Sequence, residues 1–135
     1  MLSCRSMNDQ CQDGKDTEQK EEWLIQRDKH KDVADNAFRN RAYRTAIDEY
    51  TKAISLDPDG FVVLYSNRSA AFLANSEISK SLVDAKKCVE MDPSFAKGHS
   101  RLAAALFALK RFDQAKDAYL QVLRLDTKNS SALKG

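Results

Sequence analysis

Basic and amide side chains recur at regular spacing along this chain of 135 residues. Lys97 and Arg101 are four residues apart, so on a helix both stand on one face, one turn apart. Lys31, Asn67 and Arg101 follow one another at intervals of 36 and 34 residues. Such side chains donate hydrogen bonds, and those from cations to a carboxylate are the stronger kind. The pattern therefore predicts a groove that binds an acidic group, such as the end of a peptide.

Three copies of one sequence pattern carry these residues. The copies end at Asp57, Asp92 and Asp126, which are 35 and 34 residues apart. A fixed period near 34 residues is typical of stacked helical hairpins. The sequence therefore predicts an all-α domain over residues 18–135, with three repeats at about residues 27–60, 62–95 and 96–129.

Pro58 and Pro93 follow the first two copies and bar the helix from continuing. Thr127 stands at the third such position, so a weaker helix stop is expected after Leu125. Residues 129–135 are expected to begin one more helix, an incomplete C-terminal cap. Helices are expected at about residues 42–56, 62–74, 77–91, 95–109 and 112–125, after a first helix that ends near residue 40. The aromatic residues at repeat-packing positions are expected in the core: Phe38, Tyr43, Tyr50, Phe72, Phe107, Phe112 and Tyr119.

Composition and charge narrow the class of protein. Residues 1–17 are polar and are expected to form a disordered tail, because they cannot bury enough apolar surface to fold. Residues 1–22 carry a net charge of −3 and the remainder +5. The positive charge of the remainder suits acidic peptide partners and is too small to indicate nucleic-acid binding. No apolar run approaches a membrane span and no secretory signal is evident, so we expect a cytoplasmic location with free thiols.

Catalytic and metal-binding patterns are not found in the sequence. His30 and His99 are isolated from each other and from the cysteines, and no CxxC motif occurs. There is no glycine-rich phosphate loop, no pair of catalytic carboxylates and no Ser/His/Asp arrangement. We therefore expect a binding protein without metal or cofactor, and not an enzyme.

The three copies resemble the tetratricopeptide repeat family. Positions 8, 20 and 27 of its 34-residue frame, which are small in that family, are occupied by Ala34, Ala46 and Ala53, then Ser69, Ser81 and Cys88, then Ala103, Ala115 and Val122. The resemblance covers about residues 27–135. It implies a right-handed superhelix of three helical hairpins whose first helices line a concave groove.

A narrower resemblance concerns co-chaperones of this family that bind the acidic C-terminal tails of Hsp70 and Hsp90. It is carried by the segments YSNRSAAF (residues 65–72), KGHSRLAAAL (97–106) and RFDQAKDAY (111–119). Those co-chaperones hold the tail with a clamp of five residues, and four of its positions match Lys31, Asn67, Lys97 and Arg101. The resemblance implies an adaptor for chaperone tails. Ala70, Leu73 and Ser100 are expected to lie beside the clamp.

Asp35 departs from this pattern, because the fifth clamp position is an asparagine in the family. An ionised aspartate only accepts hydrogen bonds, and its charge repels a ligand carboxylate. Asp35 is expected to pair with Lys31, four residues away on the same helix. The alternative function is a scaffold that binds a protein partner by shape, with a degenerate clamp. An unfinished cap would expose an apolar end, so a monomer or a weak dimer is expected.

Overall fold

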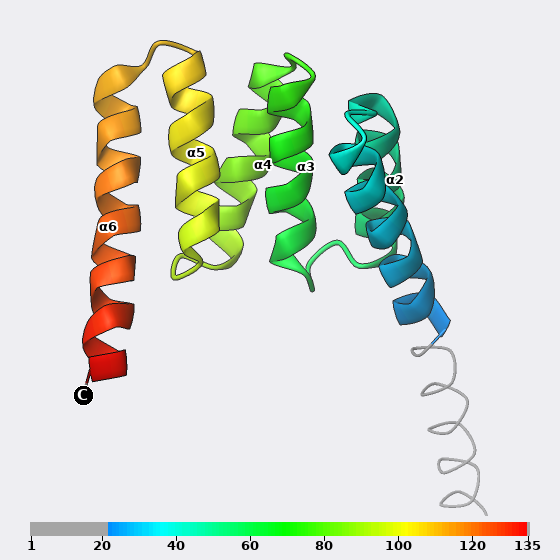
Figure 1. Ribbon diagram of the computed structural model, residues 1–135, viewed down its shortest axis with the longest axis horizontal. Helices are drawn as coiled ribbons and strands as arrows, with labels where there is room; N and C mark the ends of the chain where they lie inside the picture. The colour runs from blue at the N-terminus through cyan, green and yellow to red at the C-terminus, as the bar shows by residue number, and fades with distance from the viewer. Residues whose placement is uncertain (1–21, 135) are drawn as a thin grey trace, which may run out of the picture.

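The computed structural model describes residues 22–134, with side chains from residue 22 to residue 126. The predicted tail at residues 1–17 lies outside these residues. The described chain is all helical, and the N-terminal helix covers residues 22–39 of it. It is followed by α2 (Tyr43–Leu56), α3 (Val62–Ala74), α4 (Ile78–Met91), α5 (Ala96–Ala108) and α6 (Phe112–Lys134). Consecutive helices pair into three hairpins that stand side by side, with the N-terminal helix at one end and α6 at the other (Figure 1). The predicted helices from residue 42 to residue 109 are confirmed to within two residues.

The turn inside each hairpin has the same backbone geometry. Arg41, Ser76 and Lys110 occupy the left-handed region, with φ of 63°, 66° and 63°. At the first turn the Ala42 N–H donates to the Ala37 carbonyl at 2.8 Å. Equivalent bonds close the other two turns. This Schellman arrangement satisfies the last carbonyls of the first helix and reverses the chain within two residues.

Small side chains allow the paired helices to approach closely. Ala34, Ala46 and Ala53 in the first hairpin are fully buried. In the second hairpin the hydroxyl groups of Ser69 and Ser81 are buried, and each donates to the other's backbone carbonyl at 2.8 Å. These positions therefore serve the packing that the repeat frame predicted for them.

Gly98 brings α5 against α4. A Cβ atom at Gly98 would lie 3.0 Å from the Cβ of Cys88, which is tighter than ordinary contact. Cys88 is a free cysteine, as expected, and burial raises the pKa of its thiol to about 12. The thiol is therefore a packing group, and Gly98 sets the position of the helix that carries Lys97 and Arg101.

The predicted helix stop after Leu125 is wrong. A single helix, α6, runs from Phe112 to Lys134, and the helix expected to begin at residue 129 is its last part. Thr127 retains the backbone N–H that a proline lacks and has no ring to clash with the preceding turn. The third hairpin therefore ends in a longer helix than the first two.

Three of the aromatic residues expected in the core are exposed. Phe107, Phe112 and Tyr119 are 58%, 54% and 45% exposed, whereas Tyr50 and Phe72 are buried as predicted. The reason is positional: α3 packs on α2 and α5 packs on α4, but within the described chain no further helix packs on α6. The assignment of these three rings to the core is therefore wrong, and they form an apolar surface on α5 and α6.

Candidate functional site

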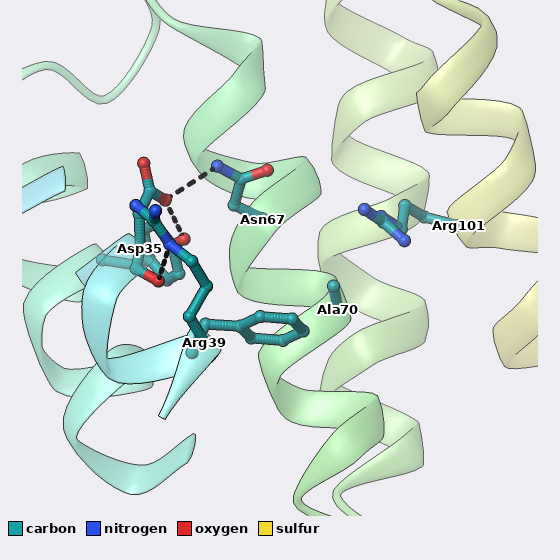
Figure 2. Close-up of a pocket in the computed structure, with 7 residues that line it drawn as sticks. Asp35, Arg39, Asn67, Ala70 and Arg101 are labelled. Atoms are coloured by element: carbon teal, nitrogen blue, oxygen red, sulfur yellow. Dashed lines mark hydrogen bonds between the residues drawn. The ribbon is translucent and has the colours of Figure 1, made fainter. Parts of the chain in front are cut away.

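A pocket of about 270 Å³ opens between the N-terminal helix, α3 and α5. Figure 2 looks into this pocket, with Asp35 and Arg39 on one side, Asn67 and Ala70 on α3, and Arg101 reaching in from α5. The first helices of all three hairpins therefore contribute to one site, as the repeat spacing predicts. Its lining consists of Asp35, Phe38, Arg39, Tyr50, Asn67, Ala70 and Arg101.

Asp35 is the centre of a hydrogen-bond network inside the pocket. Its Oδ2 accepts a hydrogen bond from the Lys31 ammonium at 2.8 Å, which confirms the expected pair on one helix face. Its Oδ1 accepts from the Tyr50 hydroxyl and, at 3.4 Å, from the Asn67 amide. The carboxylate thus engages donors from three helices.

The Tyr50 hydroxyl remains protonated in this network. Burial raises the pKa of Tyr50, and the adjacent Asp35 carboxylate raises it further, because ionising the phenol would place two negative charges together. Tyr50 is only 2% exposed. It therefore acts as a fixed donor that holds Asp35 in place.

The pocket is also lined by two cations, Arg101 and Arg39. The Nε of Arg101 is buried and has no hydrogen-bond partner among the described residues. Arg39 donates from Nε to the backbone carbonyl of Asp35 at 3.4 Å, and its side chain is exposed. Leaving a buried guanidinium nitrogen without a hydrogen-bond partner costs free energy. An anion that accepts a hydrogen bond from Arg101 would therefore gain more binding free energy than an anion bound at an open surface.

The structure brings together four of the eight residues singled out from the sequence. Asp35, Asn67, Ala70 and Arg101 line the pocket. Lys31 lies outside the lining but contacts it through Asp35. The other three are outside the lining; Lys97 is exposed, and Leu73 and Ser100 are half-buried.

Sequence reasoning missed three lining residues: Phe38, Arg39 and Tyr50. Arg39 follows Asp35 by four residues, so helical spacing alone would have placed it on the same face. Phe38 and Tyr50 were assigned to the core because they are aromatic and occupy repeat-packing positions. Tyr50 is in the core, and its hydroxyl also reaches the pocket.

The described residues lack two other kinds of feature. Among the described residues, no group of three or more His, Cys, Asp or Glu side chains is placed to bind a metal ion. In the described part of the chain, no helix combines the length and apolar character needed to cross a membrane.

Comparisons with known proteins agree with the repeat architecture. The tetratricopeptide repeat profile matches residues 96–129. A heat shock protein sti1 homolog from Schizosaccharomyces pombe is 44% identical over 99 residues, which are 73% of this chain and 17% of that protein. The chain thus spans about a sixth of that relative's length.

Two solved structures share the fold. The first tetratricopeptide repeat domain of Spaghetti (RPAP3), bound to the HSP90 peptide SRMEEVD, is 30% identical with a TM-score of 0.72, covering 82% of this chain and 95% of that one. The second such domain of human RPAP3, in complex with the HSP70 peptide SGPTIEEVD, is 27% identical with a TM-score of 0.73, covering 83% and 92%. The repeat period, the three stacked hairpins and these matches lead to one conclusion. The chain belongs to the tetratricopeptide repeat family.

Proposed function

We propose that this chain is a co-chaperone adaptor that binds the acidic C-terminal tail of Hsp70 or Hsp90 in the pocket between the N-terminal helix, α3 and α5. The observation that carries the proposal concerns Arg101, which lines a pocket shared by the first helices of all three hairpins and whose buried Nε has no hydrogen-bond partner among the described residues. A peptide end supplies a carboxylate that the Arg101 guanidinium can bind. The protein is a binding module and not an enzyme.

The remaining donors around the pocket support the same ligand. Asn67 and Arg39 extend from neighbouring helices, and Lys97 is exposed one helical turn before Arg101. Lys31 keeps two of its three N–H donors beyond the one that binds Asp35. Two solved structures with the same fold hold peptides that end in Glu-Glu-Val-Asp. An extended chaperone tail is therefore the ligand class that we expect here.

The test is a titration of fluorescent SRMEEVD peptide, with a free or an amidated C-terminus, at low and at physiological salt. We expect micromolar binding of the free acid and loss of binding on amidation. Arg101→Gln should weaken the free-acid complex at least about tenfold, since it removes a charge-assisted donor from a partly desolvated site. Arg111→Gln, at an exposed arginine in the turn between α5 and α6, is the matched control.

A second function is favoured by one observation. Asp35 engages Lys31, Tyr50 and Asn67, and so occupies donors that a ligand carboxylate would otherwise use. If the clamp is degenerate for this reason, the chain is a scaffold that binds a protein partner by shape. A scaffold would bind its partner equally well with a free or an amidated terminus, so the same titration separates the two functions.

For the oligomeric state we propose a monomer in equilibrium with a weak dimer, in a cytoplasmic protein. Phe107 and Phe112 form an edge-to-face pair with ring centroids 5.2 Å apart, as Phe38 and Tyr43 do at 5.4 Å in the first hairpin. An exposed apolar surface on α5 and α6 consists of Phe107, Phe112, Tyr119 and Leu120.

A second copy of this chain is the occupant that suits this surface. Asp113 and Asp117 lie near the start of α6, and Arg124 lies further along it. Antiparallel pairing of α6 with its counterpart, centred near Tyr119, sets Arg124 of one copy near the acidic pair of the other. Opposite charges then flank an apolar centre.

A further inference from the structure

The Asp35 carboxylate retains room for one more hydrogen-bond donor. A carboxylate offers about four acceptor positions on its two oxygens. Tyr50 and Asn67 donate to Oδ1, and Lys31 donates to Oδ2. One acceptor position on Oδ2 is therefore left, and the side chain of Asp35 is 26% exposed beside the pocket.

The residues that line the pocket carry charges of both signs. Arg39 and Arg101 are the cationic lining residues and Asp35 is the anionic one, so the lining has a net charge of +1. Figure 2 shows Arg101 entering from the α5 side, across the pocket from Asp35 on the N-terminal helix. Arg101 therefore faces Asp35 across the pocket, whereas Arg39 lies on the same side as Asp35.

A terminal aspartate would place two carboxylates in this pocket, one from the main chain and one from its side chain. Arg101 can pair with one of them, whereas the other would lie beside the negatively charged Asp35. Like charges brought together in a partly desolvated site are strongly unfavourable. A terminal residue with an amide or hydroxyl side chain avoids this repulsion and offers a donor to Oδ2.

We propose that Asp35 makes this pocket select peptide ends that carry a single negative charge, with a terminal carboxylate for Arg101 and a donor side chain, such as that of asparagine or serine, for Asp35. This selectivity rests on the proposed function, because it requires that the pocket binds a free peptide end. In this proposal Asp35 determines which peptide ends bind most tightly.

The experiment compares SRMEEVD with SRMEEVN, each with a free and an amidated C-terminus, against the wild-type chain and the Asp35→Asn variant. Asp32→Asn changes the same charge at an exposed position of the same helix and is the matched control. We expect the wild type and Asp32→Asn to bind free SRMEEVN about fivefold to tenfold more tightly than free SRMEEVD. Asp35→Asn raises the lining charge to +2 and should reverse the preference.

The amidated peptides separate failure of the selectivity from failure of the binding function. If amidation changes nothing for either peptide, the pocket does not bind a free chain end and the proposed function is wrong. If amidation abolishes binding but all three proteins prefer the same peptide by the same factor, the function stands and the role of Asp35 is refuted. Circular dichroism of Asp35→Asn checks that the variant folds. Tyr50→Phe, which frees one acceptor position on Oδ1, should keep the wild-type preference.

Discussion

Arg68 holds the carboxylate of Asp84 with two hydrogen bonds of 2.7 Å each, from α3 to α4. Asp84 is 3% exposed. Burial raises the pKa of its carboxyl, although the Arg68 guanidinium opposes that shift. The guanidinium also lies over the rings of Tyr65 and Phe72. Arg68 therefore neutralises the buried charge of Asp84 inside the second hairpin, which also carries Asn67.

Arg68→Met should strongly destabilise the fold, because it leaves the Asp84 carboxylate buried without its partner. The expected loss in the free energy of unfolding is about 3 kcal/mol, measured by urea denaturation. Adding Asp84→Leu removes the orphaned charge and should recover most of that loss. A double variant as unstable as the single one would show that the contacts of Arg68 with the two rings matter more than the charge.

Lys110→Gly should stabilise the chain, whereas Lys86→Gly should destabilise it. Lys110 has a φ of 63° at the turn between α5 and α6, which strains any residue with a Cβ. Relief of that strain, less the added entropy of the unfolded chain, gives a net gain of about 0.5 kcal/mol. Lys86 is exposed within α4, where glycine costs about 1 kcal/mol. The two substitutions remove the same charge, so thermal unfolding of both isolates the backbone effect. Equal shifts of the melting temperature would contradict the prediction.

The pair of Glu49 and His30 should make stability depend on pH in the acid range. His30 Nδ1 lies 2.7 Å from a Glu49 carboxylate oxygen, and this hydrogen bond lowers the pKa of Glu49 below its ordinary 4.5, with a further contribution from Lys52. A depressed carboxyl pKa stabilises the fold above pH 4.5, and this stabilisation is lost as the pH falls through the lowered value.

Glu49→Gln tests this dependence. Its deficit in unfolding free energy relative to the wild type should be constant above pH 5 and should shrink below about pH 4.5. Glu90→Gln, at an exposed glutamate on α4, is the control and should show no such change. A Glu49→Gln deficit that stays constant down to pH 3 would contradict the role of the pair.

Arg39→Gln should weaken binding of a free-acid chaperone peptide, although no sequence argument singled out this residue. Arg39 is one of the two cations that line the pocket, so its loss lowers the lining charge to zero. We expect affinity to fall about fivefold, and less at high salt because the side chain is exposed. Lys29→Gln, at an exposed lysine of the same helix, is the control in the same titration. Equal affinity of the two variants would remove Arg39 from the site.

Tyr119→Lys should abolish the proposed weak dimer. It places a charge at the centre of the exposed surface on α5 and α6, where Tyr119 is 45% exposed. Val83→Lys changes a valine on α4 that is 66% exposed and should leave association unchanged. Sedimentation velocity at increasing concentration measures both variants against the wild type. A wild-type chain that stays monomeric at high concentration would rule out the dimer.

The helices and the repeat frame follow from local features of the sequence. The period near 34, the prolines after Asp57 and Asp92, and the small residues at fixed positions are local features, and local features set helix ends and close packing. The same spacing predicted that Asn67 and Arg101 face one groove, and it predicted the pairing of Asp35 with Lys31. These pairs are predictable because their members lie on one helix face or are separated by one repeat length.

Which side chains meet across helices, and which remain exposed, depends on how the helices pack. Tyr50 reaches Asp35 from another helix, and this contact depends on how the first two helices cross. Tyr119 occupies the position in the third repeat that Tyr50 occupies in the first, yet one is exposed and the other buried. The residue type is identical, so the difference lies in whether a following helix packs against it. Whether a residue in a repeat array is buried depends on the helices that pack against it, and tertiary packing determines which helices those are.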